Sequence, residues 1–117
     1  MTEKGYKKLL AWRKADELAH QIYWVTRNFP KEEIYGITSQ LRRSALSVPT
    51  NLVEGCGRQG RREIKQFSNV ALGSLAETEY FLDFSLRLGY LTQENCDKLE
   101  QLRQEVGNLL WGFYRSL

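Results

Sequence analysis

Apolar residues recur three and four positions apart along four stretches of the chain, which is the spacing of an amphipathic helix. The four stretches cover residues 5–29, 37–57, 62–88 and 92–117. Pro30 ends the first stretch and Gly89 ends the third. Thr92 is a suitable N-cap for the fourth, and Glu94 suits the positive end of that helix dipole. The pattern therefore predicts four long helices joined by short connections.

Helices in this order predict an all-α fold, an antiparallel up-down-up-down four-helix bundle. The chain has 117 residues, which is the length of a single domain spanning residues 1–117. Pro49 falls inside the second helix, although the apolar positions keep helical phase on both sides of it. We expect this helix to continue through Pro49 with a kink. The carbonyl of Ala45 would then be free for water or for the side chain of Thr50 or Asn51.

The composition is that of a globular protein, with 42% hydrophobic and 26% charged residues. No apolar run is long enough to span a membrane, and residues 1–8 are polar with no signal-peptide pattern. These features predict a cytoplasmic protein with no membrane association. Two cysteines, Cys56 and Cys96, and a single histidine, His20, are too few and too widely spaced for a zinc site. We therefore expect reduced thiols and no bound metal.

Basic residues are concentrated in the first part of the chain. Residues 1–65 hold 13 Lys and Arg against 7 Asp and Glu, a net +6, whereas residues 66–117 hold 4 against 7, a net −3. Two clusters account for most of the excess, and in an antiparallel bundle both fall at the same end. The clustered residues are Lys4, Lys7, Lys8, Arg58, Arg61, Arg62 and Lys65. Such an end suits the phosphate backbone of RNA or DNA, and the alternative is a solvated basic surface that only aids solubility.

Several large apolar side chains fall outside the stripes that would form the core. Helical phase places them on outward faces, where a second copy of the chain would cover them. These residues are Tyr6, Leu10 and Trp24 on the first helix, Tyr80 and Phe84 on the third, and Trp111 on the fourth. They are the candidate oligomer interface. The alternative is ordinary surface variation, since single exposed apolar residues are common.

No motif predicts catalysis or a bound cofactor. Residues 55–60 match the glycine spacing of a dinucleotide-binding loop, with Glu79 near the distance of a ribose-binding acid. However, the glycines follow a predicted helix instead of a strand, so a helix end and a tight connection explain them better. Ser44 and Ser47 have no histidine partner in their segment. We expect Glu54 and Glu77 to be buried or half-buried and to form hydrogen bonds, with Arg42, Arg43 or Asn51 as partners.

The segment RRSALSVPTNLVEGCGR at residues 42–58 carries a family resemblance. Further matching positions are Phe29-Pro30 before the second helix, the Gln40–Arg43 stretch, and Gly73-Ser74-Leu75 with Glu77 in the third helix. With these residues the chain resembles the bacterial four-helix-bundle proteins encoded within intervening sequences of 23S rRNA genes. The resemblance covers nearly the whole chain. It departs at Leu52-Val53 and Cys56, where the family would have Ile-Ala and a small residue.

The resemblance implies a non-enzymatic homopentamer of four-helix protomers. The family also includes a distant relative, the accessory protein of diversity-generating retroelements, which binds nucleic acid and a reverse transcriptase. The leading hypothesis is therefore a non-catalytic oligomer that binds RNA or DNA, or joins a ribonucleoprotein, through its basic end. The rival hypothesis is a structural or protein-interaction oligomer that has a protein partner and no nucleic-acid ligand.

Overall fold

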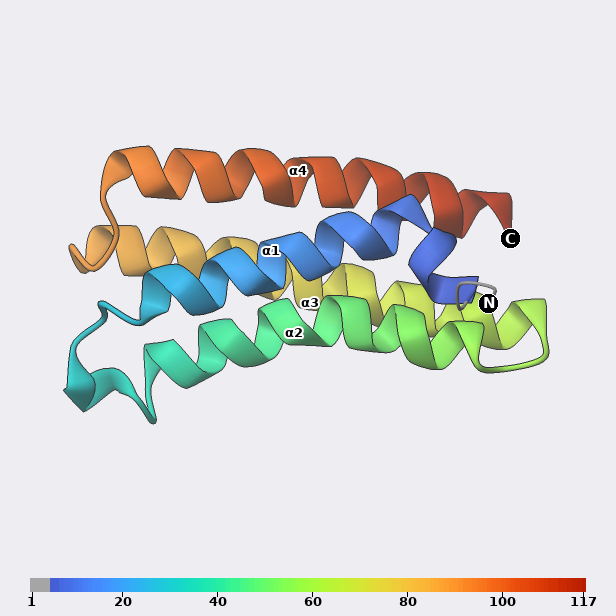
Figure 1. Cartoon of the computed structure of the whole chain (residues 1–117), viewed down its shortest axis with the longest axis horizontal. Helices are drawn as coiled ribbons and strands as arrows, with labels where there is room; N and C mark the ends of the chain where they lie inside the picture. Colours follow the sequence, from blue (N-terminus) through green and yellow to red (C-terminus); the bar gives the residue numbers. More distant parts are fainter. Residues whose placement is uncertain (1–4) are drawn as a thin grey trace.

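Four long helices form an elongated bundle of 43 × 26 × 22 Å (Figure 1). The computed structural model describes residues 5–117, and that part of the chain contains helices and no strand. In chain order the elements are the 3-10 helix η1 (Gly5–Lys8), α1 (Leu10–Thr26), the 3-10 helix η2 (Lys31–Glu33), α2 (Ile37–Cys56), α3 (Arg61–Arg87) and α4 (Gln93–Ser116). Each long helix runs opposite to the one before it (Figure 1). The predicted all-α four-helix bundle is confirmed.

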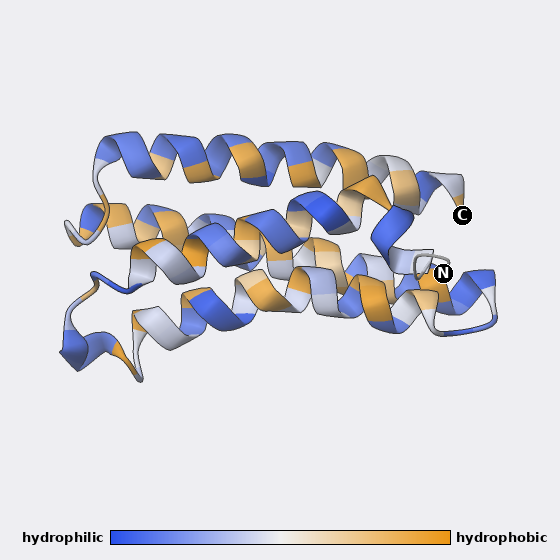
Figure 2. Ribbon diagram, in the orientation of Figure 1, coloured by the Kyte–Doolittle hydropathy of each residue, from blue (hydrophilic) through white to orange (hydrophobic). Residues whose placement is uncertain are grey.

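The core lies along the middle of the bundle. Figure 2 shows apolar residues on the inward sides of the helices and hydrophilic residues on their outward sides. Leu18, Ile22, Leu41, Val106 and Leu110 are among the fully buried side chains. Helices α1 and α3 each contact α2 and α4 but do not contact each other, so they occupy opposite corners of the bundle.

The predicted boundaries of the third and fourth helices are confirmed. Gly89 has a φ of +79°, a conformation that glycine adopts without a steric penalty. There the Tyr90 N–H donates to the Ser85 carbonyl and the Gly89 N–H donates to the Leu86 carbonyl, which is the Schellman arrangement. The Thr92 hydroxyl then accepts from the Asn95 N–H at 3.1 Å and caps α4.

The prediction of one continuous first helix over residues 5–29 is wrong at both ends. Leu9 is extended, with φ −79° and ψ 117°, so η1 is separated from α1. The Arg13 side chain fixes this bend, because its Nε donates to the Lys7 carbonyl at 2.5 Å. Tyr6 consequently does not point outward but packs edge-on against Trp12, with ring centroids 4.9 Å apart. At the other end, α1 stops at Thr26.

Helix α2 continues through Pro49, as predicted, and Pro49 is buried. The expected use of Thr50 and Asn51 on the Ala45 carbonyl is wrong. The Thr50 hydroxyl donates to the Leu46 carbonyl at 2.7 Å, and the Asn51 amide donates to the Ser47 carbonyl at 2.8 Å. Each side chain donates to the carbonyl four residues before it, so the carbonyls that accept are those of the two residues after Ala45 and not that of Ala45 itself.

Hydroxyl groups and small side chains join α2 to α3. The Thr78 hydroxyl donates to Ser44 Oγ at 2.9 Å, and the Ser47 and Ser74 hydroxyls lie 2.8 Å apart. Near the end of α2, a Cβ added to Gly55 would lie 3.1 Å from the Cβ of Phe67, so the two backbones approach closely there. Small residues along both helices permit this approach, and hydrogen bonds satisfy the polar atoms that it buries.

We predict that Thr78→Val lowers the free energy of unfolding by about 1–2 kcal/mol, because it removes the buried hydroxyl that bridges α2 and α3. Thr50→Val is the matched control, because the exposed Thr50 hydroxyl bonds only within its own helix and its loss should cost less than about 0.5 kcal/mol. Urea denaturation followed by circular dichroism measures both. Equal effects of the two substitutions would contradict a bridging role for Thr78.

Candidate nucleic-acid interface at the basic pole

One end of the bundle gathers the clusters of basic residues. Helix η1, the α2–α3 connection and the end of α4 all lie at this end (Figure 1). We call it the basic pole and define it by Lys7, Lys8, Arg58, Arg61, Arg62 and Lys65. Lys4, also predicted to belong here, lies outside the described residues. The two clusters predicted from sequence therefore share one end, as far as the described residues extend.

Arg58 differs from its neighbours because its charge is already paired. Its guanidinium lies 3.2 Å from Glu54 and 4.0 Å from Glu63, and it covers the Phe67 ring at 5.3 Å. These contacts join the end of α2 to the first turns of α3. Arg58 therefore holds the α2–α3 connection in place, and its ion pairs make it less available to an anionic ligand.

Four of the six basic side chains that define the pole are exposed and have no ion pair, hydrogen bond or aromatic contact among the described residues. They are Lys7, Lys8, Arg61 and Arg62. Arg61 and Arg62 lie in the first turn of α3, where the helix dipole is positive and disfavours cations. Gly60, the N-cap of α3, provides no side-chain acceptor. Side chains and dipole together make this end strongly attractive to anions.

The structure adds two basic residues that the sequence prediction omitted. Arg13 reaches the pole from α1 through its bond to the Lys7 carbonyl, and the exposed Arg115 lies in the last turn of α4. The antiparallel order of the helices was the available signal for Arg115, because it brings the end of α4 to the start of α1. Lys65 lies 5.0 Å from the centre of the Tyr114 ring and links α3 to α4.

The residues of the predicted oligomer interface differ in exposure. Leu10, Trp24, Tyr80 and Trp111 are each about half exposed or more, with Trp24 at 67%. Phe84 is half-buried and packs against Tyr80, with ring centroids 6.0 Å apart. Tyr6 is half-buried on Trp12, as described above, so its outward placement is corrected.

Exposed apolar residues form groups at opposite corners of the bundle. We call Trp24 and Tyr23, both exposed near the end of α1, the α1 patch, and sequence reasoning missed Tyr23. We call Tyr80, with Gly73 and Ala76 on the same face of α3, the α3 patch. A Cβ added to Gly73 would meet nothing within 4 Å, so packing within the chain does not require glycine there. In the isolated chain Tyr23 is 40% exposed, Trp24 67% and Tyr80 56%.

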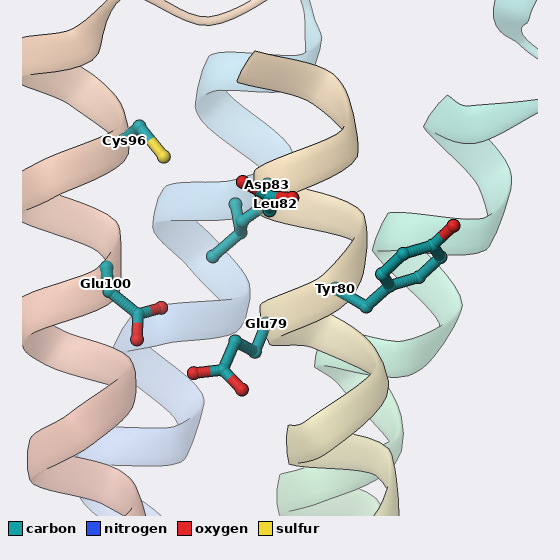
Figure 3. Close-up of a pocket in the computed structure, with 6 residues that line it drawn as sticks. All are labelled: Glu79, Tyr80, Leu82, Asp83, Cys96 and Glu100. Carbon is teal, nitrogen blue, oxygen red and sulfur yellow. The ribbon is translucent and has the colours of Figure 1, made fainter. Parts of the chain in front are cut away.

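A cavity of about 450 Å³ lies between α3 and α4 and is lined by Glu79, Asp83, Cys96 and Glu100 (Figure 3). Tyr80 also lines this cavity, although Figure 3 shows its ring on the side of α3 that faces away from Cys96 and Glu100. Burial and nearby carboxylates raise the pKa of the Cys96 thiol, so it is not an activated nucleophile. The carboxylates that line the cavity form ion pairs within the chain. Arg103 lies 2.6 Å from Glu100 and 2.8 Å from Glu79, and Asp83 pairs with Arg87.

The remaining polar candidates have structural contacts. Glu79, the ribose-binding candidate, lies in the middle of α3 and forms an ion pair with Arg103. Gly57, from the glycine-rich stretch, ends α2, and its N–H donates to the carbonyls of Val53 and Glu54. The prediction for Glu54 and Glu77 is wrong, because both are exposed and Glu54 pairs with Arg58. The predicted partners Arg42 and Asn51 instead bond Thr26 and Ser47.

Within residues 5–117, no group of His, Cys, Asp and Glu side chains could hold a metal ion. Over the same range, no helix is long and apolar enough to cross a membrane.

Residues 7–112 match the family model of the 23S rRNA-intervening sequence proteins, which covers most of the chain. The chain belongs to this family. A similar solved structure is a protein of unknown function from the S23 ribosomal protein family of Bacteroides thetaiotaomicron. It is 27% identical, with a TM-score of 0.80, over 90% of this chain and 98% of that one. No curated protein matches this 23S rRNA-intervening sequence protein.

We predict that Arg103→Leu lowers the free energy of unfolding by about 1–3 kcal/mol, because it leaves Glu79 and Glu100 facing each other without a cation. The Arg103 side chain is only 13% exposed. Arg87→Leu is the matched control, since the Arg87–Asp83 pair is exposed and its loss should cost less than about 0.5 kcal/mol. Urea denaturation compares the two, and a smaller loss for Arg103→Leu than for Arg87→Leu would contradict this assignment.

Proposed function

We propose that this 23S rRNA-intervening sequence protein is a non-catalytic oligomer that binds nucleic acid, and specifically RNA, in the cytoplasm. The basic pole is the binding surface, and it recognises phosphates. The observation that carries the proposal is the set of exposed cations at the basic pole that have no partner within residues 5–117, which includes Lys7 and Lys8 of η1 and Arg61 and Arg62 of α3. Two of them stand where the helix dipole disfavours positive charge. An anionic ligand compensates for this unfavourable placement.

The choice of RNA rests on the family, whose name refers to sequences within 23S rRNA genes. Arginine binds phosphate oxygens through two parallel N–H groups, and such contacts carry little sequence information. The carboxylates of the α3–α4 cavity pair with Arg103 and Arg87, which supports a structural role for them in the proposed non-catalytic protein.

The two apolar patches support a cyclic assembly. A closed assembly of more than two copies needs two different surfaces on each protomer, one to meet the next copy and one to meet the last. The α1 patch and the α3 patch lie at opposite corners, as such contacts require. Trp24 and Tyr80 also both lie in the half of the bundle away from the basic pole. Contacts between these patches would leave the pole uncovered, and the family resemblance implies five copies.

We predict that Arg61→Ala combined with Arg62→Ala weakens RNA binding and lowers the slope of log affinity against log salt by about two, one for each lost phosphate contact. Fluorescence anisotropy with a labelled RNA over a salt series measures both quantities. Arg87→Ala combined with Lys98→Ala is the matched control, because it removes the same charge at the opposite end. Equal binding by the Arg61/Arg62 variant and the parent would favour the structural or protein-interaction oligomer instead.

We predict that the protein has a mass in solution several times 13.7 kDa, and that Tyr80→Glu or Trp24→Glu shifts it toward the monomer. A carboxylate placed in an apolar contact must be desolvated without a partner, which weakens association by at least about tenfold. Tyr35→Glu is the control, because Tyr35 is 94% exposed and belongs to neither patch. Light scattering gives the masses, and a monomeric parent at micromolar concentration would contradict the assembly.

A further inference from the structure

An exposed tryptophan near the end of α4 gives the basic pole an aromatic surface beside its charges. Trp111 is 49% exposed, and its ring centroid lies 5.5 Å from that of Tyr114 at an interplanar angle of 86°. In such an edge-to-face contact one ring covers at most one face of the other, so Tyr114 leaves at least one face of Trp111 for a ligand. The Lys65 ammonium lies 5.0 Å from the Tyr114 centroid, so a cation and two rings link α3 to α4 here.

A hollow of about 570 Å³ lies beside this ring and is lined by Asn108, Trp111 and Arg115. Asn108 and Arg115 are both exposed, and neither side chain forms an ion pair or a hydrogen bond among the described residues. The hollow therefore combines an aromatic face, an amide that both donates and accepts hydrogen bonds, and a free cation. A nucleotide with an unpaired base presents the matching groups, which are a flat ring, a polar base edge and a phosphate.

Two further hollows follow the groove between α3 and α4 away from the pole. Trp111 also lines the nearer one, together with Glu79, and the farther one is the carboxylate-lined cavity described above. Carboxylates repel phosphate, whereas the hollow that contains Arg115 attracts it. Charge therefore favours the hollow at the pole as the place where an anionic ligand meets the Trp111 ring.

We propose that this hollow is a subsite for one unpaired nucleotide of the bound RNA, whose base stacks on Trp111 while its phosphate contacts Arg115. The inference rests on the proposed nucleic-acid binding and adds a second kind of contact to it. Every base has a flat face, so stacking of this kind tolerates different sequences. A base within a duplex is already paired and stacked between its neighbours, so the subsite takes only unpaired bases. The cations of the pole contact the backbone of either form.

The test uses the full-length protein with two labelled probes, oligo(A) and a blunt RNA duplex. Trp111→Leu removes the aromatic face but keeps an apolar side chain and the net charge. Fluorescence anisotropy over a salt series should show oligo(A) binding weakened by about 5- to 100-fold, the range for one stacked base, with an unchanged salt slope. Duplex binding should stay within about twofold of the parent, because paired bases do not reach the ring.

Three further variants separate stacking from charge. Tyr35→Leu is the matched control and should change neither affinity, because Tyr35 is 94% exposed in the α1–α2 connection, at the end of the bundle away from the pole (Figure 1). Trp111→Phe keeps an aromatic face and should recover most of the affinity for oligo(A). Arg115→Gln removes one cation and should lower the salt slope on oligo(A) by about 0.7.

Three results for Trp111→Leu would overturn the inference. Its affinity for oligo(A) could equal that of the parent, or its affinity for the duplex could fall by the same factor as that for oligo(A). Its mass by light scattering could also fall, since Trp111 would then be a contact between copies of the chain. The proposed function has a different failure: if the parent protein binds neither probe, nucleic-acid binding itself is excluded.

Discussion

The close contact between α2 and α3 is the constraint on which the rest of the molecule depends. Ser44, Ser47, Ser74 and Thr78 replace the larger apolar residues of an ordinary helix interface, and their hydroxyls bond across it. Near Gly55 the backbones come close enough that even a methyl group would crowd Phe67. The end of α2 and the start of α3 are therefore held in a fixed position on either side of the short connection between Cys56 and Arg61. Because that connection is short and its ends are held, Arg58 can pair with Glu54 and Glu63 while Arg61 and Arg62 remain in solvent.

Sequence reasoning predicted the elements whose signals are local. Gly89 and Thr92 fix the boundary between α3 and α4 through bonds to residues within five positions, and the apolar spacing defined four helices without any knowledge of their neighbours. Errors arose where one side-chain contact decides the outcome, even when the partner is only four to six residues away. Leu9 is extended although helical phase continues through it, because Arg13 bonds back to the Lys7 carbonyl. The position of Tyr6 follows from that bend and from contact with Trp12, which no periodic pattern records.

The candidate nucleic-acid interface also has one feature that the sequence predicts and one that only packing decides. Topology alone placed two clusters of basic residues at one end, since an antiparallel order determines which termini meet. It could not distinguish Arg58 from Arg61 and Arg62, three arginines within five positions that have equal charge and unequal freedom. That difference arises from two carboxylates, one on each flanking helix, and from a ring beneath the guanidinium. Which arginines are free to bind a ligand is thus a property of packing and not of composition.

The position of the apolar patches affects how tightly the basic pole can bind a nucleic acid. Trp24 and Tyr80 lie toward the ends of α1 and α3, and both helices begin at the basic pole. Contacts between an α1 patch and the α3 patch of the next copy would therefore set neighbouring bundles side by side, with all their poles on the same rim of a cyclic assembly. Each copy alone presents only a few exposed cations without an ion pair among the described residues, and affinity that rests on a few phosphate contacts falls as the salt concentration rises. Poles gathered on one rim would engage a single nucleic acid together, and each contact after the first becomes intramolecular. In the proposed function, assembly through the patches and recognition through the pole would therefore be two parts of one mechanism, because an oligomer would supply more affinity than a single protomer.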